Sequence, residues 1–191
     1  MCPSPPDNPQ AKRRARHAAR KAIAGVPPAA RDRFSGTIRR ALEDWEGFQN
    51  ARTVLVFSAL TDEPDLRPLV DSAPKRYVFP RVTGDDLALH EVRNLEELIP
   101  SRWNLLEPDP LRCPLVATHE IELALVPGVA FTRAGLRLGR GRGFYDRLLG
   151  SVGFRAVKCG VCFSAQVFSA LPTAAHDAGM DRVATEEGVW P

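Results

Sequence analysis

Several features that mark common protein classes are missing from this chain of 191 residues. No apolar run approaches the roughly 18 residues that a membrane-spanning helix needs. The Arg13-Arg14 pair is followed by further basic residues rather than by an apolar segment, which argues against a twin-arginine export signal. The net charge is only +3, so composition by itself does not suggest a nucleic-acid partner. We therefore expect a cytoplasmic protein with no nucleic-acid or membrane partner.

Cysteine is scarce, and its arrangement argues against a metal site. Cys159 and Cys162 form a C-x-x-C pair, but a zinc site needs a second pair of Cys or His at similar spacing, and the chain has none. Residues 155–163 read as a strand, in which positions three apart face opposite sides. We therefore expect the two thiols to diverge and to pack in the core as small apolar groups, as suits a protein of the reducing cytosol.

Common catalytic and nucleotide-binding signatures are absent as well. The chain holds no convincing Ser/His/Asp or Cys/His arrangement, and His119 has no partner that would make it a base for a nucleophile. The Gly-Lys-Ser/Thr sequence of a Walker loop is missing, and the dinucleotide fingerprint requires glycine where Phe144 stands. We therefore expect no side-chain nucleophile.

The chain does contain a loop rich in glycine and arginine at residues 138–143. A predicted buried strand at 123–131 precedes it, and a predicted helix at 144–149 follows it. The alternating glycines permit positive φ angles and close approach of the backbone to a ligand. Because successive N–H groups at the start of a helix attract anions, this order of elements indicates a phosphate site.

Charged side chains within and after this loop strengthen that interpretation. Arg140 and Arg142 carry guanidinium groups that suit phosphate oxygens. Asp146 would lie in the first helical turn, where a carboxylate could hold a Mg²⁺ ion that bridges to phosphate. The alternative is a solvated basic turn in which Asp146 only complements the helix dipole.

Predicted strands and helices alternate along the chain, which indicates a three-layer α/β domain with a mostly parallel sheet. Residues 1–10 contain four prolines and are expected to form a disordered tail, leaving 11–191 as a single domain. Helices are expected at 11–24, 29–50 and 94–99, and strands at 53–57, 76–82, 87–92, 123–131, 155–163 and 183–189.

The first expected helix is rich in alanine and basic residues. Lys12, Arg16 and Arg20 are spaced four residues apart, so they share one helical face. Such a stripe of like charge either faces solvent or binds an anionic partner, and spacing alone slightly favours the first.

Residues 126–146 resemble the signature of the 5-formyltetrahydrofolate cyclo-ligase family, V-P-G-x-A-F-D-x-x-G-x-R-L-G-x-G-x-G-Y-Y-D. Thr132 and Phe144 replace an Asp and a Tyr of that pattern, and neither departure removes a phosphate or metal contact. The resemblance extends over residues 11–187 and implies a Rossmann-like fold. It also implies an ATP- and Mg²⁺-dependent enzyme that closes 5-formyltetrahydrofolate to 5,10-methenyltetrahydrofolate by phosphorylating the formyl oxygen, with release of ADP and phosphate.

The resemblance implies an ATP site built from two parts of the chain. Residues 11–16 match the A-K-x-x-x-R helix of the family, so Lys12 and Arg16 would reach the phosphates of ATP. The remaining ATP-binding residues would be Gly139, Arg140, Gly141, Arg142, Gly143, Phe144 and Tyr145. The catalytic residues would be Arg142, Tyr145 and Asp146. Mg²⁺ would be held by Asp146, with Asp181 as a weaker, outer contact.

The resemblance also implies a folate site. Glu63 matches the Glu of a family D/N-E pair that binds the pterin ring, with Leu60 as an apolar wall and Tyr145 near the formyl group. A carboxylate suits a pterin because the ring presents an N–H and an amino group in a row, which can donate two parallel hydrogen bonds. Without the resemblance, Asp62 and Glu63 could equally cap a following helix. Trp103 matches a family Trp that lies against the folate, and is otherwise as easily a packing residue.

Two other interpretations remain open. A relative of the same fold could bind nucleotide or folate without catalysis. An RNA-associated protein could use the basic N-terminal helix, although the chain lacks a basic sheet interleaved with aromatic residues. On the favoured interpretation, we expect a monomer that binds ATP and 5-formyltetrahydrofolate.

Overall fold

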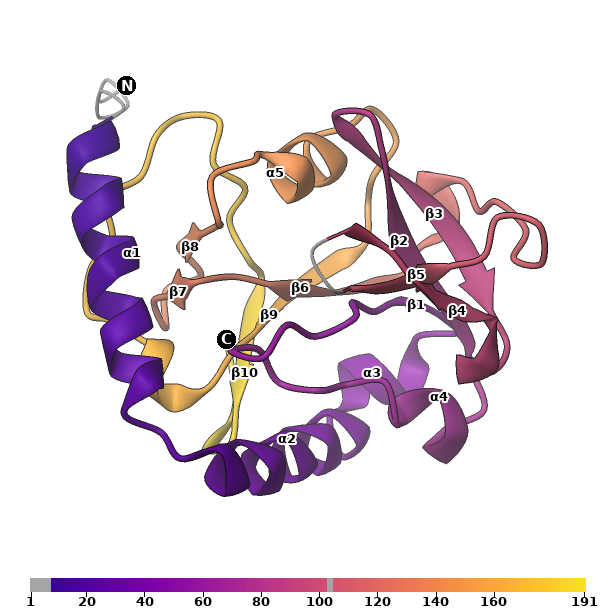
Figure 1. Cartoon of the computed structure of the whole chain (residues 1–191), viewed down its shortest axis with the longest axis horizontal. Coiled ribbons are helices and arrows are strands. Elements are labelled where there is room, and N and C mark those ends of the chain that lie inside the picture. Colours follow the sequence, from indigo (N-terminus) through magenta and orange to yellow (C-terminus); the bar gives the residue numbers. More distant parts are fainter. Residues whose placement is uncertain (1–7, 103–104) are drawn as a thin grey trace.

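A seven-stranded sheet runs through the centre of the computed structural model, which describes residues 8–102 and 105–191 (Figure 1). Its strands are β1 (Thr53–Leu55), β2 (Arg76–Thr83), β3 (Asp86–Val92), β6 (Leu123–Pro127), β9 (Val157–Val161), β10 (Arg182–Thr185) and β11 (Gly188–Trp190). In space they follow the order β11-β10-β9-β6-β1-β2-β3. The five inner strands are parallel and the two edge strands are antiparallel to their neighbours. The predicted α/β class with a mostly parallel sheet is confirmed.

Helices cover both faces of the sheet, which makes the three predicted layers (Figure 1). One face is covered by α2 (Pro28–Glu43), α3 (Glu46–Asn50) and α4 (Leu69–Ser72), and the other by α5 (Phe144–Leu149). A further helix, α1 (Pro9–Ala24), packs against the short hairpin of β7 (Ala130–Phe131) and β8 (Arg137–Leu138). The remaining elements are β4 (Leu98–Pro100), β5 (Leu106–Pro108) and the 3₁₀ turns η1 (Leu95–Glu97), η3 (Thr118–Glu120) and η4 (Ser164–Gln166).

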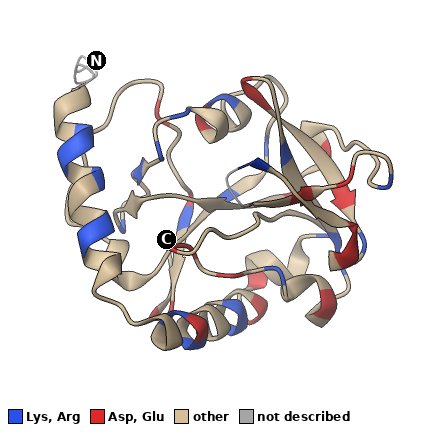
Figure 2. Ribbon diagram, viewed as in Figure 1, with Lys and Arg blue, Asp and Glu red and all other residues tan. Residues whose placement is uncertain are grey.

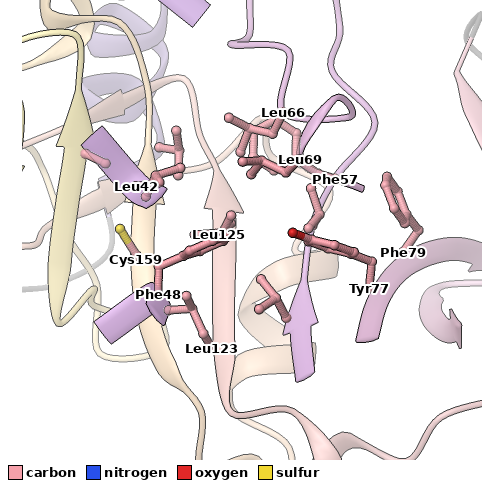
Figure 3. Close-up of a cluster of buried hydrophobic side chains, with 14 of the residues drawn as sticks. Leu42, Phe48, Phe57, Leu66, Leu69, Tyr77, Phe79, Leu123, Leu125 and Cys159 are labelled. Atoms are coloured by element: carbon pink, nitrogen blue, oxygen red, sulfur yellow. The ribbon is translucent and has the colours of Figure 1, made fainter. Parts of the chain in front are cut away.

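Successive side chains of each strand point to opposite faces and so build two separate cores. In β6, Leu123 and Leu125 belong to the core under α2, α3 and α4, whereas Ala124 and Val126 belong to the core under α5. Figure 3 shows the first core, in which Phe48 of α3 lies beside Leu123 and Leu125. Because both faces are buried, β6 is a continuous apolar run rather than an alternating one.

The two cysteines of the C-x-x-C pair lie in different cores, as predicted. Cys159 packs in the first core and Cys162 in the second, and both are fully buried. Burial raises the pKa of Cys159 to about 12 and raises that of Cys162 well above its ordinary value. The pair is therefore structural, with thiols on opposite faces of the sheet.

Several predicted boundaries are wrong, each for a local reason. The helix expected at 29–50 is divided into α2 and α3, because Trp45 takes an extended conformation between them. The strand expected at 183–189 is a hairpin of β10 and β11 with Glu186 and Glu187 in its turn, and β11 begins at Gly188, whose φ of 134° favours glycine. The short helix expected at 94–99 is η1 followed by β4. The strand expected at 123–131 ends at Pro127 as β6, and residues 130–131 form the separate strand β7.

The N-terminal helix begins earlier than predicted. Residues 1–7 of the expected tail lie outside the described part of the chain, while Pro9 and Gln10 already belong to α1. The side chain of Asn8 accepts a hydrogen bond of 3.0 Å from the N–H of Ala11, and Pro9 occupies the first helical position. Within 8–102 and 105–191, no helix has both the length and the apolar character of a membrane crossing.

Candidate active site

Two cavities adjoin at the carboxyl ends of the parallel strands, where ligands bind in open α/β sheets. The first, of about 400 Å³, is mainly apolar and includes Phe57 after β1 and Pro127 at the end of β6. The second, of about 460 Å³, lies between α1 and the glycine–arginine loop and is more polar. Four residues line both cavities, namely Gly139, Arg142, Gly143 and Asp146. Residues from both predicted ligand sites therefore line two adjoining cavities that share part of their walls.

The glycine–arginine loop has the geometry expected of a close-approach turn. It connects β8 to α5, and the helix covers the predicted residues 144–149. Gly143 caps the start of α5 with a φ of 71°, and Gly141 has a φ of 104°. Because side chains other than glycine are strained at these angles, the loop needs glycine at both positions.

The polar cavity brings α1 to this loop. Nε of Arg16 donates a 2.8 Å hydrogen bond to the carbonyl of Gly139, and Nζ of Lys12 lies 2.7 Å from a carboxylate oxygen of Asp177. Lys12 is buried, and both basic residues line the cavity with Arg142. Figure 2 shows the basic segments of α1 along its length. The structure therefore brings together most of the residues that the resemblance assigned to ATP, namely Lys12, Arg16, Gly139, Gly141, Arg142 and Gly143. The other three, Arg140, Phe144 and Tyr145, line the apolar cavity instead.

The apolar cavity contains the buried carboxylate of Glu63. One oxygen, Oε2, accepts a 3.0 Å hydrogen bond from the N–H of Leu60, and the other, Oε1, accepts from Nε and Nη2 of Arg140 at 3.0 and 2.8 Å. Arg140 also pairs with Asp62, so neither acidic residue caps a helix. Burial raises the pKa of Glu63, although the charge of Arg140 opposes that shift. Leu60 lines the same cavity.

A buried arginine that the sequence interpretation left without a role holds Asp146 in place. Nη2 of Arg137 lies 2.6 Å from Oδ1 of Asp146, and Nη1 donates a 3.1 Å hydrogen bond to the carbonyl of Pro127. The N–H of Ala178 reaches the same Oδ1 at 3.3 Å. The signature contains an Arg at position 137, which is the signal that could have identified it.

Three buried polar atoms of the apolar cavity's residues have no hydrogen-bond partner within the described chain. They are Oγ of Ser58, Nε of Arg137 and Oη of Tyr145. Burial raises the pKa of Tyr145, so its hydroxyl keeps its proton. Unsatisfied buried polar groups are rare, and their gathering around one cavity marks it as a place for a polar ligand.

The structure does not bring every predicted residue to this region. Asp181 is exposed, and its Oδ2 accepts a 2.8 Å hydrogen bond from the N–H of Lys158 at the start of β9, so it lines neither cavity. No group of three or more His, Cys, Asp and Glu side chains suited to a metal occurs among the described residues. Trp103 lies outside the described residues. Phe144 lines the apolar cavity.

Comparison with known proteins supports one family for the whole chain. The model of the 5-formyltetrahydrofolate cyclo-ligase family matches residues 8–186. The NMR structure of Aquifex aeolicus 5,10-methenyltetrahydrofolate synthetase superposes with a TM-score of 0.83 at 31% identity, covering 94% of this chain and 91% of the other. The 5-formyltetrahydrofolate cyclo-ligase of Mycolicibacterium smegmatis is 29% identical over 188 residues, 93% of this chain and 95% of the relative. The mitochondrial cyclo-ligase of Arabidopsis thaliana is 25% identical over 214 residues, 94% of this chain and 76% of the relative.

With its fold, its loop signature and nearly its full length matched, the chain belongs to the 5-formyltetrahydrofolate cyclo-ligase family of enzymes.

Proposed function

We propose that this enzyme closes 5-formyltetrahydrofolate to 5,10-methenyltetrahydrofolate and uses ATP to do so. One observation carries the proposal: an apolar cavity with a buried carboxylate adjoins a basic cavity, and the two meet at the glycine–arginine loop. A planar folate ring suits the first cavity and a triphosphate suits the second. Their shared wall would bring the γ-phosphate close to the formyl group.

The reaction needs activation of a poor leaving group rather than a protein nucleophile. Transfer of the γ-phosphoryl group to the formyl oxygen releases ADP and gives a phosphorylated intermediate. N10 of the folate then attacks the formyl carbon and gives up its proton to solvent, and departure of phosphate completes the methenyl bridge. Catalysis of this kind depends on position and on neutralising charge.

The chain offers suitable groups for both tasks. Lys12, Arg16 and Arg142 would hold the phosphates, assisted by backbone N–H groups at the start of α5. Glu63 would anchor the pterin through paired hydrogen bonds. Tyr145 would border the formyl group, because its ring lines the apolar cavity next to the loop.

Asp146 fits a Mg²⁺ ion that is held mainly by phosphate oxygens. Magnesium in phosphoryl-transfer sites commonly uses one or two carboxylates and completes its shell with phosphate and water. The carboxylate of Asp146 lies where the two cavities meet, and Arg137 fixes one of its oxygens. When bound there, Mg²⁺ would neutralise charge on the transferred phosphoryl group. The exposed position of Asp181 does not favour a share in that role.

Formation of the methenyl product, followed by its near-ultraviolet absorbance, tests the proposal. The protein is mixed with 5-formyltetrahydrofolate and Mg²⁺, with and without ATP, and Asp146→Asn serves as the control variant. We expect a band that grows only with ATP and that is lost in the variant. Binding of both ligands without product would contradict the proposal and indicate a non-catalytic relative.

We also propose a cytoplasmic location. The cysteines at positions 113, 159 and 162 are free, which is consistent with a reducing compartment. Fractionation of cells that produce the protein would test it.

A further inference from the structure

Arg140 lies on the boundary between the two cavities. Its neighbours Gly139 and Gly141 line the polar cavity, whereas its own side chain lines the apolar cavity. There the guanidinium group pairs with Glu63 and Asp62. The resemblance assigns Arg140 to the ATP site, but its guanidinium group lies in the apolar cavity that is proposed to bind folate.

The carboxylate of Glu63 is nearly saturated by this arrangement. It accepts one hydrogen bond from the N–H of Leu60 and two from Arg140. A carboxylate offers about four acceptor positions, so two parallel donors from a pterin cannot both be accepted while Arg140 remains. Binding of a ligand with paired donors requires the guanidinium group to withdraw.

The side chain of Arg140 has room to change its position, whereas that of Glu63 is enclosed. The side chain of Arg140 is 31% exposed, and that of Glu63 only 6%. The carbonyl of Gly139 is held by Arg16, so the loop can stay docked on α1 while the arginine side chain turns. The adjacent polar cavity, with Lys12, Arg16 and Arg142 on its wall, is where phosphates would attract a further guanidinium group.

We propose that Arg140 exchanges one partner for another when the ligands bind. Folate displaces its guanidinium group from Glu63, and the released group then binds the phosphates of ATP. This inference rests on the proposed function. Without folate, departure of Arg140 would leave the buried Glu63 carboxylate unpaired, which is unfavourable, so ATP alone cannot recruit it. The two ligands therefore bind synergistically, and the effect is reciprocal.

The test measures how folate changes the affinity for a nucleotide that cannot react. A β,γ-imido analogue of ATP with Mg²⁺ is titrated by calorimetry into the full-length protein, with and without saturating 5-formyltetrahydrofolate. In the wild type we expect folate to tighten analogue binding about tenfold, within the usual range of coupling between sites. In Arg140→Met the ratio of the two affinities should fall to about one, as for uncoupled sites. Folate alone should bind this variant at least as tightly as it binds the wild type, since its competitor is gone.

Two further variants distinguish the exchange of Arg140 from a role in which a loop arginine only binds phosphate. Arg142→Met changes the other arginine of the same loop and should weaken the analogue equally with and without folate, so the ratio is kept. Glu63→Gln removes one of the two charges that hold Arg140 and leaves only Asp62, so the analogue alone should bind more tightly, toward the affinity seen in the wild type with folate. This second prediction does not depend on the folding of the Arg140 variant.

Three results of these titrations would overturn the exchange, and each can be recognised separately. A ratio of about one in the wild type, or an unchanged ratio in Arg140→Met, would overturn the exchange, because uncoupled sites have a ratio of one. Weaker folate binding in Arg140→Met would overturn it too, and would show that Arg140 only supports Glu63. Failure of the proposed function is seen separately, as absence of the methenyl product in the turnover assay, whereas the exchange is measured by the ratio of affinities. A wild type that binds no folate would overturn both.

Discussion

Glu63 and Arg142 carry opposite charges and, in the proposal, serve different ligands. Glu63→Gln keeps the shape of the side chain but removes the charge, so we expect folate affinity to fall about 10- to 100-fold without weaker ATP binding. Arg142→Ala removes a phosphate-binding group at an exposed position, so ATP affinity should fall about tenfold and folate affinity less. Calorimetric titration of each ligand checks both. Equal losses for both ligands in Arg142→Ala, or unchanged folate affinity in Glu63→Gln, would contradict the assignments.

Arg137 is a positioning residue for Asp146. Its side chain is 4% exposed and that of Asp146 is 22% exposed, so loss of the guanidinium group leaves a largely buried carboxylate without its charged partner. We expect Arg137→Met to cost about 3 kcal/mol in the free energy of unfolding and to raise the Mg²⁺ concentration needed for half-maximal turnover. Arg137→Lys, which keeps the charge, should recover part of both losses. A stability loss with unchanged Mg²⁺ dependence would reduce Arg137 to a structural role.

Among the elements, α1 is attached to the C-terminal part of the chain by the ion pair of Lys12 and Asp177. Burial by itself raises the pKa of Asp177, but hydrogen bonds from Lys12 and the N–H of Ala174, with the charge of Lys12, lower the net value below 3.8. A carboxylate whose pKa is lowered by folding adds stability above its unfolded pKa and loses it as pH falls through the folded value. The pair therefore stabilises the protein at neutral pH, and this contribution is lost progressively as pH falls below about 4 and through the lower pKa of the folded state.

This dependence on pH can be measured. Asp177→Asn should lower the free energy of unfolding by about 2 kcal/mol near pH 6, a value between those of exposed and buried pairs. The two proteins should converge in stability as pH falls below about 4 and through the lowered folded pKa of Asp177, because the wild-type carboxylate then becomes protonated as well. Urea unfolding at several pH values gives the comparison. A difference in stability that stays the same at every pH would show that the lost charge is not the cause.

The start of α5 depends on the left-handed conformation of Gly143. Gly143→Ala should cost about 1 kcal/mol through strain at a φ of 71°, and should reduce turnover because the loop and Asp146 shift with the helix. Gly84→Ala is the matched control, since Gly84 has a φ of 62° and nothing within 4 Å of an added Cβ, in the turn between β2 and β3. Thermal unfolding should show similar losses of stability in the two variants. Turnover should fall only in Gly143→Ala. Equal activity losses in both would contradict a specific role for the loop.

At the scale of the whole molecule, alkylation of Cys159 and of Cys162 can show when each of the two cores unfolds. Burial raises the pKa of both thiols, so neither is available as a thiolate in the folded protein. If residues 11–191 unfold as one domain, both thiols should become alkylated at the same urea concentration. Mass spectrometry of peptides after a brief iodoacetamide pulse measures this. Labelling of one thiol well before the other would indicate that the two faces of the sheet unfold separately.

Elements with a clear local signal were predicted well. Neighbouring residues carry the signal for the apolar run at 123–127 and for the change from glycine to helix at 143–144. The strand β6 and the helix α5 therefore follow from the sequence. The opposite directions of Cys159 and Cys162 follow from the two-residue period of a strand. The hairpin of β10 and β11 was missed because its turn is only two residues long, Glu186 and Glu187, and lies inside the segment that was predicted as one strand.

The sequence by itself therefore determined the α/β class, the anion-binding loop and, through its signature, the family. The tertiary structure alone decided which charges meet. Lys12 and Asp177 are 165 residues apart, and Arg140 and Glu63 are 77 apart. Helical and strand periods arise from neighbours along the chain, whereas an ion pair between distant segments exists only after the sheet has brought those segments together, because its strength depends on distance and burial.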